Sequence, residues 1–325
     1  MLREDILKLL FETPYAELCA RADAVRQSEK GRHVFVRALI EFSSHCERNC
    51  RYCGLRAANA TSRRYHLAEK DILEAAESAA NLGADTIVLQ SGEVHDNPQC
   101  LARIVDALRL RLPTTALALS VGEHPASSYA LWKEAGASRF LLKHETADPA
   151  LYTSLHPGRS LQQRVEALHA LRKLGYEVGS GFMVGLPGQK PESLADDILL
   201  ARSLRVDMCG AGPFIPQADT PLGHEASGSA RLSLRVMATL RIALPWANLP
   251  ATTALATLNP VQGQREGLLA GGNVLMPGFT PQAYRQEYRL YDNKRHIGME
   301  EVRQVIESAG YTHSLPQKEE YAGHA

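Results

Sequence analysis

The sequence predicts an α/β fold: a (β/α)8 TIM barrel with N-terminal helices and a short C-terminal helical extension. Two observations favour it. Short β-branched or apolar runs alternate with stretches of helical periodicity, and several of those stretches end in a glycine directly before the next run. Strands that alternate with helices form a parallel sheet, and eight such units are most simply closed into a barrel.

Two amphipathic helices are expected first, at 3–11 and 16–29, with Pro14 between them. Eight strands are predicted at 34–42, 86–91, 115–120, 139–144, 177–184, 206–211, 250–256 and 272–276. Helices are predicted between them at 68–82, 100–111, 127–135, 160–174, 191–204 and 229–243, and a helix with a polar tail ends the chain. No Pro-, Gly- or Ser-rich linker divides this pattern. We therefore expect an N-terminal helical extension (1–32), one barrel (33–292) and a C-terminal helix and tail (293–325).

The charge balance excludes a protein that binds nucleic acid through bulk charge, because 36 Lys and Arg residues face 36 Asp and Glu residues. With 45% hydrophobic residues, the composition is that of an ordinary globular protein. The apolar runs are far shorter than the roughly 18 residues that a membrane helix needs. The N-terminus lacks the apolar core of a signal peptide. These features predict a cytoplasmic protein with no membrane partner.

Three of the six cysteines, Cys46, Cys50 and Cys53, crowd into eight residues directly after the first predicted strand. In a barrel this loop lies on the C-terminal face, where active sites are built. Thiolates select zinc, copper(I) or iron–sulfur clusters. His45 or His66 would complete a closed zinc site. Three thiolates on a cubane cluster would instead leave one iron open, and the position of the loop favours this second interpretation.

This cysteine spacing, with Tyr52 before the third cysteine, resembles the signature loop of the radical S-adenosylmethionine (SAM) enzymes. The resemblance implies a radical SAM barrel with one [4Fe-4S] cluster, whose open iron binds SAM and whose electron cleaves it to a 5′-deoxyadenosyl radical. It also implies that Gly92 and Glu93, at the end of the second strand, lie beside the SAM amino group. Ser120, at the end of the third strand, could approach the ribose.

Polar residues gather at three other predicted strand ends. The fourth strand ends in Lys143, His144, Glu145 and Thr146, which are costly to bury unpaired. Glu145 could accept hydrogen bonds from ribose hydroxyls, and Arg164 could bind a carboxylate as a fork, although a solvated helix face is the commoner place for such an arginine. The seventh strand carries Thr252 and Thr253. Tyr288 and Tyr291 follow the eighth strand and could line a polar cavity or pack in the core.

A wider set of segments resembles the HydE family of [FeFe]-hydrogenase maturases: EFSSHCERNCRYCGLR, TIVLQSGE, AGASRFLLKHETADP, LGYEVGSGFMVGLPGQ, GPFIPQADTPL, LPATTA, GGNVLMPGFTP and YRQEYRLY. The resemblance spans about residues 35–292. It implies oxygen-sensitive radical chemistry in assembly of the di-iron subcluster of the hydrogenase. The implied partners are an organometallic iron–cysteine substrate, a reductant such as a ferredoxin or flavodoxin, and other maturases. The implied roles are cluster ligation by Cys46, Cys50 and Cys53, SAM binding by Glu145, Arg164 and Met208, and substrate binding by Lys143, Thr252, Thr253, Tyr288 and Tyr291.

Two departures from that family and three alternatives stay open. Many HydE proteins carry further cysteines near the C-terminus, whereas this chain has none after Cys209, so a single cluster is predicted. Lys143 stands where the family pattern has arginine, and an ammonium does not bind anions as a fork. Sulfur insertion of the biotin synthase type is disfavoured because Cys209 is the only further cysteine on a predicted strand. A radical mutase resembling methylornithine synthase and a non-catalytic zinc protein are the remaining alternatives.

Overall fold

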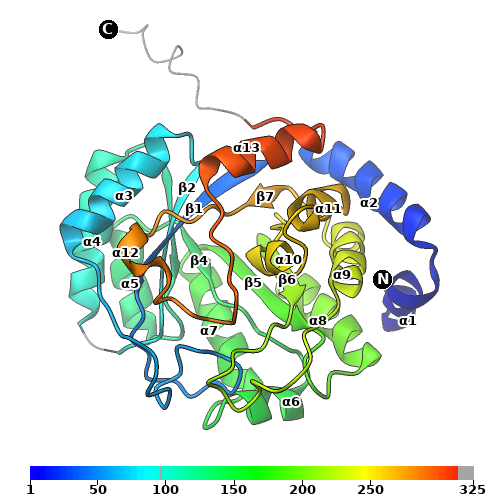
Figure 1. Cartoon of the computed structure of the whole chain (residues 1–325), viewed down its shortest axis with the longest axis horizontal. Helices are drawn as coiled ribbons and strands as arrows, with labels where there is room; N and C mark the ends of the chain where they lie inside the picture. Colours follow the sequence, from blue (N-terminus) through cyan, green and yellow to red (C-terminus); the bar gives the residue numbers. More distant parts are fainter. Residues whose placement is uncertain (96, 314–325) are drawn as a thin grey trace, which may run out of the picture.

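Seven parallel strands form one curled sheet in the computed structural model, which describes residues 1–95 and 97–313 (Figure 1). The strands lie in the order β6-β5-β4-β3-β2-β1-β7. Their bounds are β1 Phe35–Ser43, β2 Thr86–Ser91, β3 Ala116–Ser120, β4 Arg139–Leu141, β5 Glu177–Val184, β6 Met208–Pro213 and β7 Val274–Leu275. Each strand from β2 to β6 lies beside the strand that precedes it in the chain, as the βα alternation predicts.

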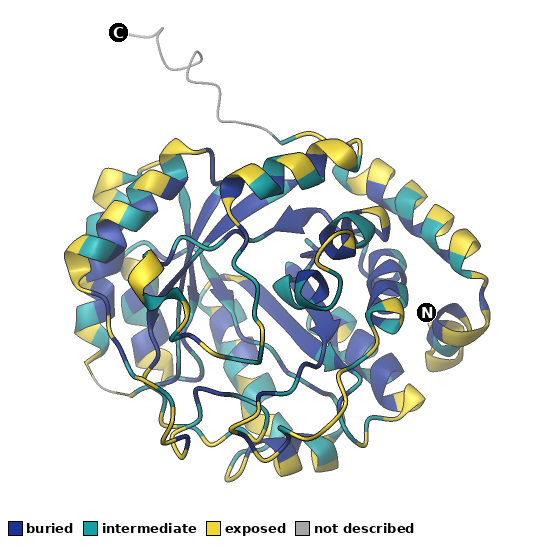
Figure 2. Cartoon of the chain, in the orientation of Figure 1, coloured by how far each residue is buried: buried dark blue, intermediate teal, exposed yellow. Residues whose placement is uncertain are grey.

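The two faces of the sheet have different surroundings. Alternate residues of β1, such as Ala38 and Ile40, are fully buried in the hydrophobic cluster that also holds Ile72 and Ala76 of helix α3 (Glu69–Asn81). Leu39, between them, points to the opposite, concave face and is partly exposed although its strand is central. Figure 2 shows the strands buried beneath a ring of helices. The helix-facing side of the sheet is therefore its packed core, while solvent reaches part of the concave face.

The predicted strand at 250–256 is wrong. Pro250 makes only a single bridge to Val274 of β7, and Asn248 makes one to Met208 of β6. This extended segment thus joins the two edge strands in the place of an eighth strand. The chain then turns into helix α10 (Thr253–Leu258), because the Thr252 side chain accepts a hydrogen bond from the Leu255 N–H and caps the helix.

The predicted helices are all present within one or two residues at most ends. Their bounds are α1 Arg3–Leu7 with the π-helical turn η1 Lys8–Glu12, α2 Tyr15–Lys30, α3 Glu69–Asn81, α4 Pro98–Arg111, α5 Ala126–Glu134, α7 Leu161–Lys173, α8 Pro191–Ser203, α9 Ala230–Ala243 and α13 Met299–Ser308. Helices α6 Pro149–Leu155, α10, α11 Gly263–Leu269 and α12 Gln282–Arg285 were not predicted.

The N-terminal helices pack against the β6 side of the sheet. Helix α2 lies against α9, and α1 lies against α8 (Figure 1). Arg26 of α2 is fully buried and donates to the carbonyl oxygens of Gly31, His33 and Gly272, which ties the helix to the loop before β7. None of the described helices is both long and apolar enough to cross a membrane. The predicted polar tail at 316–325 lies outside the described residues.

Candidate functional site

The cysteine loop follows β1 and lies at the carboxyl ends of the strands, as predicted. Its three thiols, Cys46, Cys50 and Cys53, are half-buried and unpaired. Burial, followed by the neighbouring Cys46 thiol, raises the pKa of Cys50 to about 12. Burial and then Cys50 and Cys46 raise the pKa of Cys53 too. Thiols so placed are poor thiolates unless a positive metal centre stabilises them, so this donor set fits an iron–sulfur cluster. Among described residues, no three His, Cys, Asp or Glu side chains converge on one ion.

Strand β2 ends in direct contact with this loop. A Cβ atom on Gly92 would lie 2.2 Å from the His45 carbonyl oxygen and 2.6 Å from the Cys46 Cβ, so only glycine fits. One residue later, the Glu93 carbonyl accepts a hydrogen bond from the Glu47 N–H at 2.8 Å. The buried Glu93 carboxylate pairs with Arg48 of the loop. Gly92 and Glu93 therefore hold the cysteine loop against the sheet.

Tyr52 belongs to the cysteine loop and directly precedes Cys53. Its hydroxyl is 2.9 Å from Nε2 of His156, which follows helix α6. The His156 Nδ1 bonds to the Tyr152 carbonyl at 3.0 Å, so Nδ1 carries the proton and Nε2 accepts from Tyr52. Burial, followed by Arg164, lowers the pKa of His156 to about 4. A neutral imidazole thus supports the loop through a tyrosine.

Arg164 is not on a solvated helix face. Only 12% of its side chain is exposed, and its Nε pairs with Glu123, which also pairs with Arg159. Its Nη1 donates to the Lys143 carbonyl oxygen at 2.6 Å. Glu123 ends the SVGE segment after β3, so this arginine joins the ends of two strands. Sequence reasoning identified Arg164 but missed Glu123 as its partner.

The end of β4 brings Lys143 and Glu145 together on the concave face. The Lys143 Nζ lies 3.0 Å from Glu145 Oε2, and the two side chains are 31% and 14% exposed. Ser120, at the end of β3, pairs in register with Gln90 of β2. These strand ends offer cationic donors and a carboxylate acceptor, which suits a ligand that carries an α-amino acid and a ribose.

A second charged group, which the sequence did not predict, lies beside Tyr288 and Tyr291. Lys294 pairs with the buried Glu41 of β1, whose Oε2 also accepts a hydrogen bond from the Thr280 hydroxyl at 3.0 Å. The Lys294 Nζ lies 5.0 Å from the ring centre of the buried Tyr288. Burial raises the pKa of Tyr291 beside the same glutamate. The signal for this group was a glutamate within the apolar run VFVRALIEF.

Thr252 is near β6, because a Cβ atom on Gly212 would lie 2.6 Å from its Oγ1. Thr253 is the first residue of α10, so the alternation of side chains expected for a strand does not apply to this pair.

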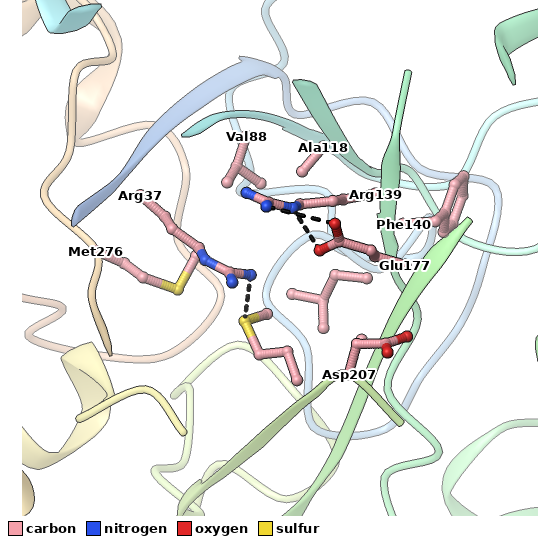
Figure 3. Close-up of a pocket in the computed structure, with 11 residues that line it drawn as sticks. Arg37, Val88, Ala118, Arg139, Phe140, Glu177, Asp207 and Met276 are labelled. Atoms are coloured by element: carbon pink, nitrogen blue, oxygen red, sulfur yellow. Dashed lines mark hydrogen bonds and ion pairs between the residues drawn. The ribbon is translucent and has the colours of Figure 1, made fainter. Parts of the chain in front are cut away.

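Met208 does not join the other predicted SAM contacts. It is the first residue of β6, at the amino end of the sheet, and its Sδ lies 2.9 Å from Nη1 of Arg37, which lines a small pocket there (Figure 3). The same small pocket is lined by the Arg139–Glu177 ion pair and by Met276. The cysteine loop is at the carboxyl ends of the strands, so the predicted role of Met208 in SAM binding has no support from this placement.

Comparison with known proteins decides the family. A family model described as the radical SAM superfamily matches residues 40–201. The chain is 47% identical to the [FeFe] hydrogenase maturase subunit HydE of Thermotoga maritima, over 84% of this chain and 78% of that protein. The chain belongs to the HydE family of radical SAM enzymes. A HydE-family chain is an enzyme, so the non-catalytic zinc alternative is wrong.

Three further comparisons place this family member among its relatives. The 3-methylornithine synthase of Methanosarcina acetivorans is 27% identical over 93% of this chain and 85% of that protein. The crystal structure of methylornithine synthase (PylB) superposes with a TM-score of 0.86 at 25% identity, covering 96% of this chain and 94% of that one. A crystal structure of the maturase HydG shares the fold, with a TM-score of 0.82 at 17% identity over 98% of this chain and 73% of that one. Radical SAM enzymes use a [4Fe-4S] cluster and SAM, so this chain is expected to contain both.

Proposed function

We propose that the chain is an oxygen-sensitive HydE-type enzyme that acts in assembly of the di-iron subcluster of [FeFe]-hydrogenase. The observation that carries this proposal is the group of three half-buried thiols on the loop after β1, in a chain 47% identical to a HydE. Cys46, Cys50 and Cys53 would ligate one [4Fe-4S] cluster. When bound, the reduced cluster supplies the electron that cleaves SAM.

The chain's own residues would bind and orient SAM. Gly92 and Glu93 keep the cysteine loop against β2, which fixes the cluster ligands relative to the sheet. Arg164 offers a guanidinium for the SAM carboxylate, and Glu145 offers an acceptor for the ribose hydroxyls. Ser120 is the last residue of β3, the strand that lies between β2 and β4 in the sheet.

The substrate would bind farther along the concave face. Lys143 provides a cation at the end of β4, while Thr252, Thr253, Tyr288 and Tyr291 provide hydroxyl groups from the last part of the barrel. This set suits a small anionic complex, such as an organometallic iron–cysteine precursor, because a cation and several O–H donors can bind the same ligand. A ferredoxin or flavodoxin would reduce the cluster, and other maturases would supply the precursor and receive the product.

The cofactor part of the proposal is tested by anaerobic reconstitution. The wild-type protein should bind about four irons, give a cluster signal that SAM alters, and release 5′-deoxyadenosine on reduction. Cys50→Ala should lose both the cluster and SAM cleavage, while Cys100→Ala, which removes a cysteine of α4 outside the three-cysteine motif, should keep both. A colourless wild-type protein, or a fully active Cys50→Ala protein, would contradict the ligand assignment.

The substrate part is tested by activation of an apo-[FeFe]-hydrogenase together with the partner maturases. Methylornithine synthase activity is the second candidate, favoured by the TM-score of 0.86 to that enzyme. The same reconstituted protein should therefore also be assayed for the formation of methylornithine. Hydrogenase activation without methylornithine formation supports the proposal, and methylornithine formation without activation refutes it.

A further inference from the structure

Glu145 occupies a strained backbone conformation. It is one of three described non-glycine residues with positive φ, at 63°. The Thr146 N–H donates to the His144 carbonyl oxygen at 2.7 Å, which spans two residues with Glu145 in the middle. This is the γ-turn with positive φ, which is rare and strained. Such a turn persists only when the surrounding structure enforces it.

The residue before the turn is fixed by Ser180 of β5. The backbone N–H of His144 and its ring Nδ1 both bond to the Ser180 Oγ, at 3.1 and 3.0 Å. The Ser180 hydroxyl donates its own proton to the Leu142 carbonyl at 2.9 Å. Ser180 can then only accept from the imidazole, so the proton of His144 is on Nδ1.

The residues after the turn are fixed by Asp197 of helix α8. Its Oδ1 accepts a hydrogen bond from the Ala147 N–H, and its Oδ2 accepts one from Gln189 Nε2 at 3.3 Å. Asp197 and His144 are both fully buried. The Nε2 atom of His144 has no hydrogen-bond partner and faces Asp197 Oδ1 at 3.8 Å.

A count of protons shows how these two groups coexist. With its proton on Nδ1, neutral His144 presents a lone pair to Asp197, and an ionised carboxylate would repel it. This repulsion is smallest when the carboxyl group is protonated. Burial raises the pKa of Asp197 and lowers the pKa of His144 to about 3, so both shifts favour the uncharged forms of the two groups. The pair is then neutral, as a fully buried pair with few donors should be.

We propose that His144 and Asp197 are positioning residues that clamp the Glu145 turn from both sides and thereby hold the Glu145 carboxylate beside Lys143 in the orientation that SAM requires. The role of Glu145 toward SAM rests on the proposed function above. The clamp itself rests on the contacts of His144, Ser180 and Asp197. Neither clamp residue faces the concave side, since His144 packs on Phe182 with ring centres 5.5 Å apart, and Phe182 belongs to the helix-facing core.

The test compares Asp197→Asn and Asp197→Ala in the reconstituted protein. Asparagine with its Oδ1 toward the Ala147 N–H keeps that hydrogen bond, but its amide nitrogen replaces the oxygen that accepts from Gln189 Nε2, so this variant should be looser than wild type and tighter than the alanine variant. Alanine leaves both donors unpaired, which costs about 1–3 kcal/mol and corresponds to about 5- to 150-fold in an opening equilibrium. Asp197→Ala should therefore speed hydrogen exchange at the amides of Thr146 and Ala147 at least fivefold and raise the KM for SAM by a similar factor, with kcat changed less than threefold.

Two further variants keep the test decisive. Asp196→Ala removes the neighbouring carboxylate of α8, which is paired with Arg3 at the surface, and should alter neither readout. Ser180→Ala removes the hydrogen bonds that hold the other side of the turn, so it should show the effects expected for Asp197→Ala. It therefore provides the test if Asp197→Ala does not fold. Unchanged exchange at residues 146 and 147 in Ser180→Ala, or an Asp197→Asn protein as loose as the alanine variant, would overturn the clamp. Faster exchange in Ser180→Ala without a change in the KM for SAM would leave the clamp standing and overturn its role toward SAM.

Discussion

Acidification should weaken the fold through His156, and the size of the effect follows from its burial. The His156 side chain is buried and neutral between Tyr52 and the Tyr152 carbonyl, and burial, followed by Arg164, lowers its pKa to about 4. In the unfolded chain an imidazole titrates near pH 6.5. Between these two values the unfolded state binds a proton that the folded state does not, so stability is present above pH 6.5 and is lost as the pH falls towards 4.

The magnitude is largest in a convenient window. At pH 5 an unfolded histidine with a pKa near 6.5 is almost fully protonated, which favours unfolding by about 2 kcal/mol relative to pH 8. The value barely depends on the folded pKa, provided that it stays below about 4.5. A loss of about 2 kcal/mol is a substantial part of the 5–15 kcal/mol that typically stabilises a folded domain.

The assay is urea unfolding of wild-type protein and His156→Gln at pH 8 and pH 5, followed by the fluorescence of Trp132 and Trp246. Glutamine does not titrate, so the difference in unfolding free energy between the two proteins should shift by about 2 kcal/mol in favour of the variant at pH 5. Tyr52→Phe is the matched control. It removes the hydrogen bond but keeps the buried imidazole, so its difference from wild type should be the same at both pH values. An equal difference for His156→Gln at pH 8 and pH 5 would refute the reasoning.

Three other changes have expected outcomes. Gly92→Ala should displace the cysteine loop, because its Cβ would lie 2.2 Å from the His45 carbonyl oxygen, and iron analysis after reconstitution should show a clear loss; full iron content would contradict the close approach. Lys294→Met should lower the unfolding free energy by about 3–5 kcal/mol in urea, since it leaves Glu41 buried and unpaired, while Glu41→Gln combined with Lys294→Met should recover most of that loss. Thr252→Ala should cost about 1 kcal/mol in the same assay through the lost cap of α10, and Thr252→Ser should not.

The order of the first six strands could be predicted because each is apolar, is followed by a helix of regular periodicity, and runs parallel to its predecessor. The seventh predicted strand failed for a local reason. Residues 250–256 combine two threonines, which favour a strand, with proline and alanine, which do not, and Thr252 two residues before an Ala-Leu-Ala run is equally a capped helix start. The competition between these two structures depends on tertiary contacts such as that between Thr252 and Gly212, which sequence does not reveal.

The site divides in the same way. The cysteine loop and the Gly-Glu pair were predictable, because both follow directly from a strand end and a short motif. Partners distant in sequence were not: Glu123 is joined to Arg164 and Arg159, and Glu41 to Lys294, over separations that only the fold closes. Helix α6 did leave a signal, since Asp148 before Pro149 is an N-cap followed by a proline in the first turn.

The paired charges at the site bear on how an anionic ligand would bind. Lys143, Arg164 and Lys294 each already pair with a carboxylate, of Glu145, Glu123 and Glu41 respectively. A ligand carboxylate or an anionic metal complex must therefore exchange with an existing partner or share the cation with it. Exchange costs least at Lys143, because its pair is the most exposed of the three and its ammonium has several rotatable donors. It costs most at Lys294, where a glutamate only 4% exposed would be left without its cation. An incoming anion is thus expected to select Lys143 at the end of β4, while the Glu41–Lys294 pair keeps the tyrosine end of the barrel neutral.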